Sequence, residues 1–257
     1  MVKGLYTAYT GMINQQKRLD VTSNNLANAT TVGFKKEGAT SQAFDDMLAI
    51  KVKDSSENYV DRPIGYLNLG VKVGETYTNY NQGSFRETSN TFDLALAGDG
   101  FFTISFTNKA GVESTLYTRD GSFTMTKEGY LVTKDGDFVL GQGGPIQMST
   151  TAEIKIDELG RIYEDGEYVD TLKITDFEDY NYLEKYGENM YSAIEGATER
   201  TDVATAAVQQ GYLEMSNVNV VEEMVSMITI QRAYEAAQKV ETSIDDILEK
   251  TVTLGQV

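Results

Sequence analysis

Three amino acids are missing from this chain, and each absence narrows the chemistry open to it. The 257 residues include no Cys, no His and no Trp. Without Cys there can be no disulfide, no thiol nucleophile and no thiolate metal ligand. Without His the chain lacks the commonest general base and the commonest metal ligand. A hydrolase built on carboxylates stays open, whereas most other enzyme mechanisms are excluded.

Long apolar runs are missing as well. No stretch reaches the roughly 18 apolar residues that a membrane-spanning helix requires. The first 15 residues lack an apolar run followed by a small-residue cleavage site, which a secretory signal peptide would show. We therefore expect a protein that is either cytosolic or exported by a route that reads a different signal.

Charge is distributed unevenly along the chain. The net charge is −17. Residues 206–257 carry eight acidic and three basic side chains. Residues 1–36 are basic instead: they contain one acidic residue, Asp20, and five basic ones, Lys3, Lys17, Arg18, Lys35 and Lys36. Residues 37–205 hold most of the negative charge. Such an acidic surface repels phosphate backbones and anionic lipid, so we expect no nucleic-acid partner and no membrane insertion.

Both ends of the chain show the seam spacing of a coiled coil, with steps of three and four residues. The N-terminal series is Leu5, Tyr9, Met12, Gln16, Leu19, Ser23 and Leu26, and the C-terminal series is Val240, Ile244, Ile247, Thr251 and Leu254. We predict one helix over residues 3–28 and another over residues 206–253. Their seams and opposite charges indicate surfaces that pack on each other or on neighbouring copies.

The C-terminal helix is longer than a domain of this size needs for its own core. Asn219 followed by Glu222 is typical of an N-cap with a capping-box partner. Apolar residues occur on more than one side of the helix, at Met224, Met227, Ile228, Ile230 and Tyr234. We therefore expect this helix to contact several neighbours, most of them other subunits.

Three Asn residues near the end of the first helix allow two interpretations. Asn24, Asn25 and Asn28 are poor helix formers. They indicate either fraying at a helix end or a polar contact that sets the register between subunits, as a buried Asn does in coiled coils. The sequence leaves both interpretations open.

The middle of the chain changes character twice. Residues 36–90 are rich in Ser, Thr, Asn and Gly and predict an extended arm, with a short helix near 42–50. Residues 91–195 predict short strands joined by tight turns, because an acidic residue followed by Gly between apolar segments is a strong hairpin signal. Such pairs occur at Asp120-Gly121, Glu128-Gly129, Asp135-Gly136 and Asp165-Gly166.

The predicted fold class is therefore α+β: long N- and C-terminal helices that pair as a coiled coil, with an inserted antiparallel all-β domain. The predicted domains are 1–35 (N-terminal helix), 36–90 (extended arm), 91–205 (β domain) and 206–257 (C-terminal helix).

No motif predicts a catalytic, cofactor-binding or metal-binding residue. Asp135 to Asp137 lacks the ligand spacing of a calcium loop, and Gly141 to Pro145 lacks the Lys and Ser or Thr of a phosphate-binding loop. The carboxylates form no catalytic pair in a recognisable motif. A carboxylate-dependent cell-wall glycosidase and a secreted adhesin remain alternatives, but neither explains the paired ends. We expect no cofactor and no enzyme activity.

The residues at both ends resemble a known family. Tyr6 to Lys36 reads YTAYTGMINQQKRLDVTSNNLANATTVGFKK and is similar to the N-terminal signature of bacterial flagellar axial proteins, which are rod, hook and hook–filament junction subunits. The C-terminal positions that match are Gly211, Leu213-Glu214, Ser216 to Val218, Glu223-Met224, Met227-Ile228 and Gln231 to Glu235. Asp93 to Phe102 and Tyr117 to Gly121 resemble the start of the family's β domain.

The resemblance implies a structural subunit of the flagellar basal-body rod, which stacks helically into the drive shaft that carries torque from motor to hook. Length favours a rod subunit over a hook or junction subunit. Val139 to Ile146 resembles the proximal-rod type more than the distal-rod type, while the long arm keeps the distal alternative open.

The resemblance also implies partners and a location. The partners are copies of this chain, other rod and hook subunits, and the flagellar type III export apparatus. The location is the extracytoplasmic basal body, reached without a cleaved signal peptide. The expected assembly residues are Leu5, Met12, Leu19, Asn24, Asn25, Leu26, Asn28, Met224, Met227, Ile228, Gln231, Arg232, Tyr234, Val240, Ile244 and Ile247.

Overall fold

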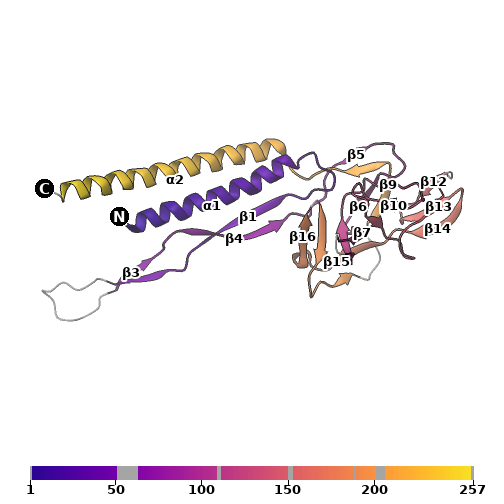
Figure 1. Cartoon of the computed structure of the whole chain (residues 1–257), viewed down its shortest axis with the longest axis horizontal. Helices are drawn as coiled ribbons and strands as arrows, with labels where there is room; N and C mark the ends of the chain where they lie inside the picture. Colours follow the sequence, from indigo (N-terminus) through magenta and orange to yellow (C-terminus); the bar gives the residue numbers. More distant parts are fainter. Residues whose placement is uncertain are drawn as a thin grey trace. The chain divides into compact units, whose positions relative to one another are not determined.

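The computed structural model describes residues 2–50, 63–108, 111–149, 153–187, 189–200 and 206–255 (Figure 1). It is an α+β structure with a helix at each end and antiparallel strands between them. The chain forms two compact units. Unit 1 comprises Met1–Ala27, Glu37–Thr78 and Asn219–Val257, and unit 2 comprises Asn28–Lys36 and Asn79–Val218. Neither helix has, within the described ranges, the length and hydropathy needed to cross a membrane.

Unit 1 consists of two long helices and an extended ribbon. The helices are α1 (Val2–Ala27) and α2 (Val220–Leu254), and they run side by side (Figure 1). The ribbon pairs β1 (Glu37–Ala43) with β4 (Val71–Thr78) and continues as β2 (Met47–Ile50) paired with β3 (Pro63–Leu67). Helix α1 contacts α2 as well as β1 and β4. It therefore lies between the second helix and the ribbon.

The start of α2 is fixed by a local signal in the sequence. The side chain of Asn219 accepts hydrogen bonds from the backbone N–H groups of Val221 (3.1 Å) and Glu222 (3.4 Å). Glu222 and Glu223 lie in the first turn, where the helix dipole favours negative charge. The N-cap prediction at Asn219 is thus confirmed, and the 35-residue helix is about 52 Å long.

Two predicted helical segments are strands. The prediction of helix over 206–219 was wrong, because β19 (Ala207–Gln210) pairs with β6 (Leu94–Ala97) and β20 (Tyr212–Glu214) pairs with β5 (Phe85–Glu87). The short helix expected near 42–50 was also wrong, because β1 ends at Ala43 and Met47–Ile50 form β2. In both segments the backbone hydrogen bonds go to strands elsewhere in the sequence, which the local pattern does not reveal.

Unit 2 is built from short antiparallel strands. Beyond β5, β6, β19 and β20 its strands are β7 (Phe101–Thr107), β8 (Glu113–Thr118), β9 (Thr124–Met125), β10 (Leu131–Val132), β11 (Phe138–Val139), β12 (Ile154–Ile156), β13 (Arg161–Glu164), β14 (Glu167–Thr171), β15 (Ile174–Phe177), β16 (Leu183–Gly187), β17 (Met190–Ala193) and β18 (Glu199–Arg200). The main sheet follows the order β16-β17-β8-β7-β11-β10-β9, with β15 also paired to β7 and β18. A second sheet has the order β12-β13-β14. The predicted antiparallel β domain is confirmed.

Two apolar clusters form the core of unit 2. The larger one gathers aliphatic and aromatic side chains from the main sheet, the β12–β14 sheet and the β6–β19 pair, among them Leu96, Phe102, Ile104 and Ile162, all at most 1% exposed. The smaller one is aromatic and centres on Phe101 and Tyr191, whose ring centroids are 5.5 Å apart. Edge and tilted ring contacts of this kind add stability beyond the area that they bury.

Three of the four predicted hairpin turns are present. Gly129 and Gly136 adopt positive φ angles (87° and 97°) in the turns of the β9–β10 and β10–β11 hairpins. Asp165 and Gly166 (47° and 91°) form the turn between β13 and β14. The hairpin predicted at Asp120-Gly121 was wrong. Gly121 instead lies against the carbonyl of Leu94, where a Cβ atom would collide.

Candidate assembly surfaces

The two helices of unit 1 pack in an antiparallel arrangement. Near one end Asn25 Nδ2 donates to Glu223 Oε2 (3.4 Å). Near the other end a Cβ atom on Gly4 would lie 3.4 Å from Ile244 Cδ1. Between them, Arg18 and Ile230 line the same 210 Å³ cavity. The residue numbers of these facing pairs rise on one helix as they fall on the other, which defines the register.

Small and polar residues form the buried face of α1. The side chains that are at most 9% exposed are Ala8, Asn14, Thr22 and Asn25. Leu5, Met12, Leu19 and Leu26 are only partly buried, and Tyr9, Gln16 and Ser23 are exposed. The predicted seam therefore lies beside the buried stripe, and much of it remains accessible in the single chain.

The predicted assembly residues of α2 also differ in exposure. Met227, Tyr234 and Ile244 are partly buried. Met224, Ile228, Val240 and Ile247 are each 50–51% exposed. Gln231 and Arg232 are exposed too. The buried residues of this helix are Glu223 and Ile230, on the face toward α1.

The three Asn residues behave differently from one another. Asn25 is 1% exposed, accepts from the backbone N–H of Glu37 (2.9 Å) and donates to the backbone O of Glu37 (2.7 Å). It therefore binds the first residue of β1 to the end of α1 within one chain. Asn24 is exposed, and Asn28 lies in a turn of unit 2, where its side chain accepts from Thr31 Oγ1 (3.2 Å). The interpretation of Asn25 as a frayed helix end is wrong.

An apolar groove runs between α1 and the ribbon. Its volume is about 550 Å³. It is lined by Thr10, Ile13, Asn14, Lys17, Asp20, Val21, Ala39, Phe44, Val71, Lys72, Val73 and Thr76. Ile13 (39% exposed) and Phe44 (38% exposed) are accessible at its surface. The sequence analysis did not identify this groove, because its two walls are 18 or more residues apart in the sequence.

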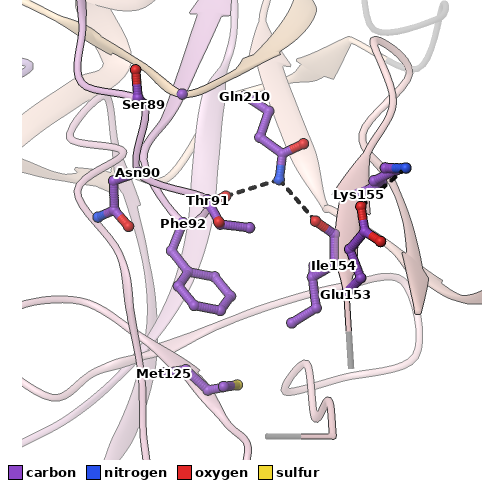
Figure 2. A pocket seen from close by; sticks show the side chains of 10 residues that line it. Ser89, Asn90, Thr91, Phe92, Met125, Glu153, Ile154, Lys155 and Gln210 are labelled. Atoms are coloured by element: carbon purple, nitrogen blue, oxygen red, sulfur yellow. Dashed lines mark hydrogen bonds and ion pairs between the residues drawn. The ribbon is translucent and has the colours of Figure 1, made fainter. Parts of the chain in front are cut away.

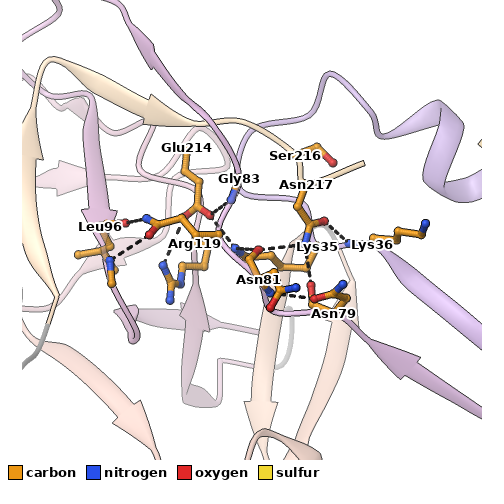
Figure 3. A network of polar contacts seen from close by, with 12 residues as sticks. Lys35, Lys36, Asn79, Asn81, Gly83, Leu96, Arg119, Glu214, Ser216 and Asn217 are labelled. Atoms are coloured by element: carbon orange, nitrogen blue, oxygen red, sulfur yellow. Dashed lines mark hydrogen bonds and ion pairs between the residues drawn. The ribbon is translucent and has the colours of Figure 1, made fainter. Parts of the chain in front are cut away.

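Unit 2 contains a buried network of charges (Figure 3). Glu214 lies between two cations: Lys35 Nζ is 2.6 Å from Oε1, and Arg119 Nη1 is 3.3 Å from Oε2. All three side chains are at most 3% exposed. Lys35 Nζ also donates to the backbone O of Asn81 (3.0 Å), and Glu214 Oε1 accepts from the backbone N–H of Gly83 (2.9 Å).

Burial lowers the pKa of Lys35, and the negative charge of Glu214 opposes that effect. Nearby, Asn217 accepts from the N–H of Lys36 (2.8 Å) and donates to the carbonyls of Asn79 and Asn81. The network thus holds together four segments that are distant in sequence. The sequence analysis gave Lys35, Arg119 and Glu214 no role, because nothing in the neighbouring sequence indicates that a charged side chain is buried.

A cavity in unit 2, of about 530 Å³, lies beside the edge of β12 (Figure 2). The Gln210 side chain donates from Nε2 to the carbonyls of Thr91 (3.0 Å) and Ile154 (3.3 Å). Its Oε1 accepts from the N–H of Ile156 (3.2 Å). The Gln210 carboxamide therefore forms the hydrogen bonds that a peptide group of an adjacent strand would form with β12. It occupies the open edge of β12, which limits pairing with other chains there.

No group of three or more acidic side chains with the geometry of a metal site occurs in the described ranges. Unit 1 presents accessible apolar residues and an apolar groove as candidate assembly surfaces.

Comparison with known proteins agrees with this architecture. Residues 5–35 match the family described as "Flagella basal body rod protein", residues 95–164 match "Flagellar hook protein FlgE/F/G D1 domain", and residues 209–254 match "Flagellar basal body rod FlgEFG protein C-terminal". The chain is 34% identical to the flagellar basal-body rod protein FlgG of Bacillus subtilis, with 99% of each chain covered. It is 33% identical to FlgG of Caulobacter vibrioides (98% and 99% covered) and to FlgF of Mesorhizobium japonicum (91% and 90% covered).

These matches cover both helical ends and the β domain in order. The chain belongs to the flagellar basal-body rod protein family. Its position along a rod, proximal or distal, stays a prediction.

Proposed function

We propose that this chain is a structural subunit of the flagellar rod. In this proposal it polymerises helically with copies of itself and with other rod and hook subunits, and the polymer transmits torque from the motor to the hook. The observation that carries the proposal is the full-length similarity to FlgG proteins, which includes both terminal helices. The accessible apolar residues of unit 1 supply surfaces on which such a polymer can form.

The terminal helices are proposed to pack as a coiled coil. Their antiparallel contact and the half-buried heptad positions Leu5, Met12, Leu19 and Leu26 support this arrangement. Each single exposed ion pair is worth about 0–1 kcal/mol. Apolar packing would therefore supply most of the affinity, and the opposite charges of the two ends would set orientation.

We also propose that the chain performs no catalysis and needs no cofactor. It is proposed to leave the cell interior through the flagellar type III export apparatus, without removal of a signal peptide. The relatives are named as rod proteins, which favours a mechanical role over the carboxylate glycosidase.

The test is purification of basal bodies from cells that produce a tagged chain. Electron microscopy with a label against the tag is expected to place it in the rod, and mass spectrometry is expected to find the N-terminal peptide uncleaved. Label confined to the hook would favour a hook or junction subunit instead. Absence of the chain from basal bodies and hooks would contradict the function.

A further inference from the structure

Unit 2 is completed by the part of its chain that comes last in the sequence, residues 206–218, which we call the closing segment. It contains β19 and β20, which pair with β6 and β5. Among the strands that the structure describes, β19 is the only one paired with β6, and β20 is the only one paired with β5. Both pairings span more than 100 residues of sequence. Two early strands of unit 2 therefore depend on a segment that is made much later.

Strand β6 is fully buried in the larger apolar cluster, where Leu94, Ala95 and Leu96 are at most 1% exposed. Backbone N–H and C=O groups that are buried without a hydrogen-bond partner cost about as much free energy as a lost hydrogen bond. Without β19, the groups of β6 that now bind it would be left in that position. The closing segment also adds the side chains of Ala206 and Val208 to the same cluster. The core of unit 2 is therefore incomplete until this segment is in place.

The closing segment also joins β6 to the β12–β14 sheet. The N–H of Val208 donates to the backbone O of Glu158 (2.8 Å), in the turn between β12 and β13. The Gln210 side chain accepts from the N–H of Ile156 (3.2 Å) and donates to the backbone O of Ile154 (3.3 Å), both on β12 (Figure 2). One strand of the segment thus connects two parts of unit 2 that belong to different sheets.

Farther along, the closing segment binds residues 28–36. The N–H of Gly33 donates to the backbone O of Glu214 (2.8 Å), whose carboxylate binds Lys35. The Asn217 side chain accepts from the N–H of Lys36, a contact that spans 181 residues. The first and last segments of unit 2 are therefore held by one another as well as by the sheets between them.

We infer that the closing segment controls when unit 2 folds. Until it pairs with β6 and β5, the remaining strands, β7 and β8 among them, have no complete core, and unit 2 then folds in a single step. Contacts this distant in sequence form slowly, because a long loop must close before they contribute stability. The segment leads directly into the N-cap of α2 at Asn219. A folded β domain is thus present only in chains that also contain the start of α2, and incomplete chains do not display one.

Refolding of the full-length chain from urea tests this order of events without any substitution. Pulsed hydrogen exchange, read by mass spectrometry, would follow peptides from β7 and β8 and peptides from the closing segment. We expect the two sets of amides to gain protection with the same time constant. Protection of β7 and β8 in an earlier phase, before the closing segment is protected, would overturn the inference while the proposed function stands.

Two full-length variants test the same control through rates. Val208→Ala removes a buried contact of the closing segment, and we expect it to slow the protection of β7 and β8 about 10-fold while unfolding accelerates about 3-fold or less. Gly211→Ala leaves no cavity but strains the turn between β19 and β20, where φ is 80°, and should also act mainly on refolding. It serves as the second variant if Val208→Ala does not fold.

The matched control is Val169→Ala, the same substitution at a position of β14 that is 36% exposed. It should change neither rate by more than about 2-fold. Unchanged refolding with faster unfolding in the closing-segment variants would show that the segment docks after the rest of unit 2 has folded, and would overturn the inference.

Discussion

Glu214 compensates two buried cations, so its charge dominates the polar network of unit 2. We expect Glu214→Gln to lower the free energy of unfolding by about 3–5 kcal/mol, because Lys35 and Arg119 would remain buried without their counter-charge. Urea unfolding of the full chain measures this loss. The matched control is Glu153→Gln, whose ion pair with Lys155 is 73–75% exposed and should change stability little. Equal losses in the two variants would contradict the role given to the network.

The phenol of Tyr117 is expected to make the stability of the folded chain decrease at high pH. Burial raises the pKa of Tyr117 from its ordinary 10.0 to about 12, and the charge of Glu199, to which it donates a hydrogen bond (3.1 Å), acts in the same direction. The folded chain therefore retains this proton more strongly than the unfolded chain. The resulting stability is fully present below pH 10 and is lost as pH rises toward 12.

We expect the wild-type chain to exceed Tyr117→Phe in unfolding free energy by a constant amount below pH 10. The difference should shrink between pH 10 and 12, which denaturant melts at stepped pH would detect. A difference that grows over this range would show that the tyrosinate is favoured in the fold.

Asn25 of α1 forms hydrogen bonds with Glu37 of β1 and with Glu223 of α2. Replacing Asn25 should therefore reduce the protection of the Glu37 amide. We expect Asn25→Ala to speed hydrogen exchange of the Glu37 amide roughly 5–30-fold, because a hydrogen bond worth about 1–2 kcal/mol is removed from a buried site. Exchange measured by nuclear magnetic resonance or mass spectrometry checks it. Asn24→Ala, at the adjacent exposed position, is the control and should leave that amide protected. Equal acceleration in both variants would mean that general helix fraying, not the Asn25 contact, controls the amide.

At the scale of elements, Met224→Asp should block incorporation into basal bodies while leaving the chain folded. Met224 is 50% exposed in the single chain, so the substitution costs little there. In a polymer that covers this face, an unpaired charge would cost several kcal/mol. Basal-body content by immunoblot and circular dichroism of the purified chain are the two measurements. Met224→Leu keeps the apolar surface and should incorporate, and normal incorporation of the Asp variant would exclude this face as an interface.

The sequence predicted correctly those elements that a few adjacent residues specify, and it failed for strands whose partners are distant in the sequence. The N-cap at Asn219 and the turns at Gly129, Gly136 and Gly166 each rest on a few adjacent residues, and each was predicted correctly. The strands β19 and β20 were mistaken for helix because their partners, β6 and β5, lie more than 100 residues earlier. Their pairing is set by non-local contacts, which override local preference.

The contact surface of α1 could not be predicted from hydropathy for a different reason. Its most buried residues are Ala8, Asn14, Thr22 and Asn25, which are small or polar, whereas the apolar Leu5, Met12 and Leu19 lie partly exposed beside them. Hydrophobic periodicity therefore predicted the helix correctly, but it identified the row of residues beside the buried face as the contact surface. The groove depended on bringing α1 against a ribbon of unknown register, so it too required the structure.

At the scale of the whole molecule, unit 2 is expected to fold without the terminal helices and to be less stable without residues 28–36. This segment buries Phe34 (2% exposed) and Lys35 (1% exposed) in unit 2, and Lys185 Nζ lies 4.4 Å from the ring centroid of Phe34. Burial of Phe34 alone is worth about 1.5–3 kcal/mol. Without the segment, Glu214 would also retain only Arg119 as a buried counter-charge.

We therefore expect a chain of residues 28–218 to unfold cooperatively, and a chain of residues 79–218 to lose about 3 kcal/mol or more. For a chain of this size that loss lowers Tm by roughly 6–12 °C, which differential scanning calorimetry would resolve. A chain of residues 37–218 is the matched control, because it retains the ribbon but lacks the segment, and it should melt like residues 79–218. If all three chains melted together, residues 28–36 would contribute no stability to unit 2.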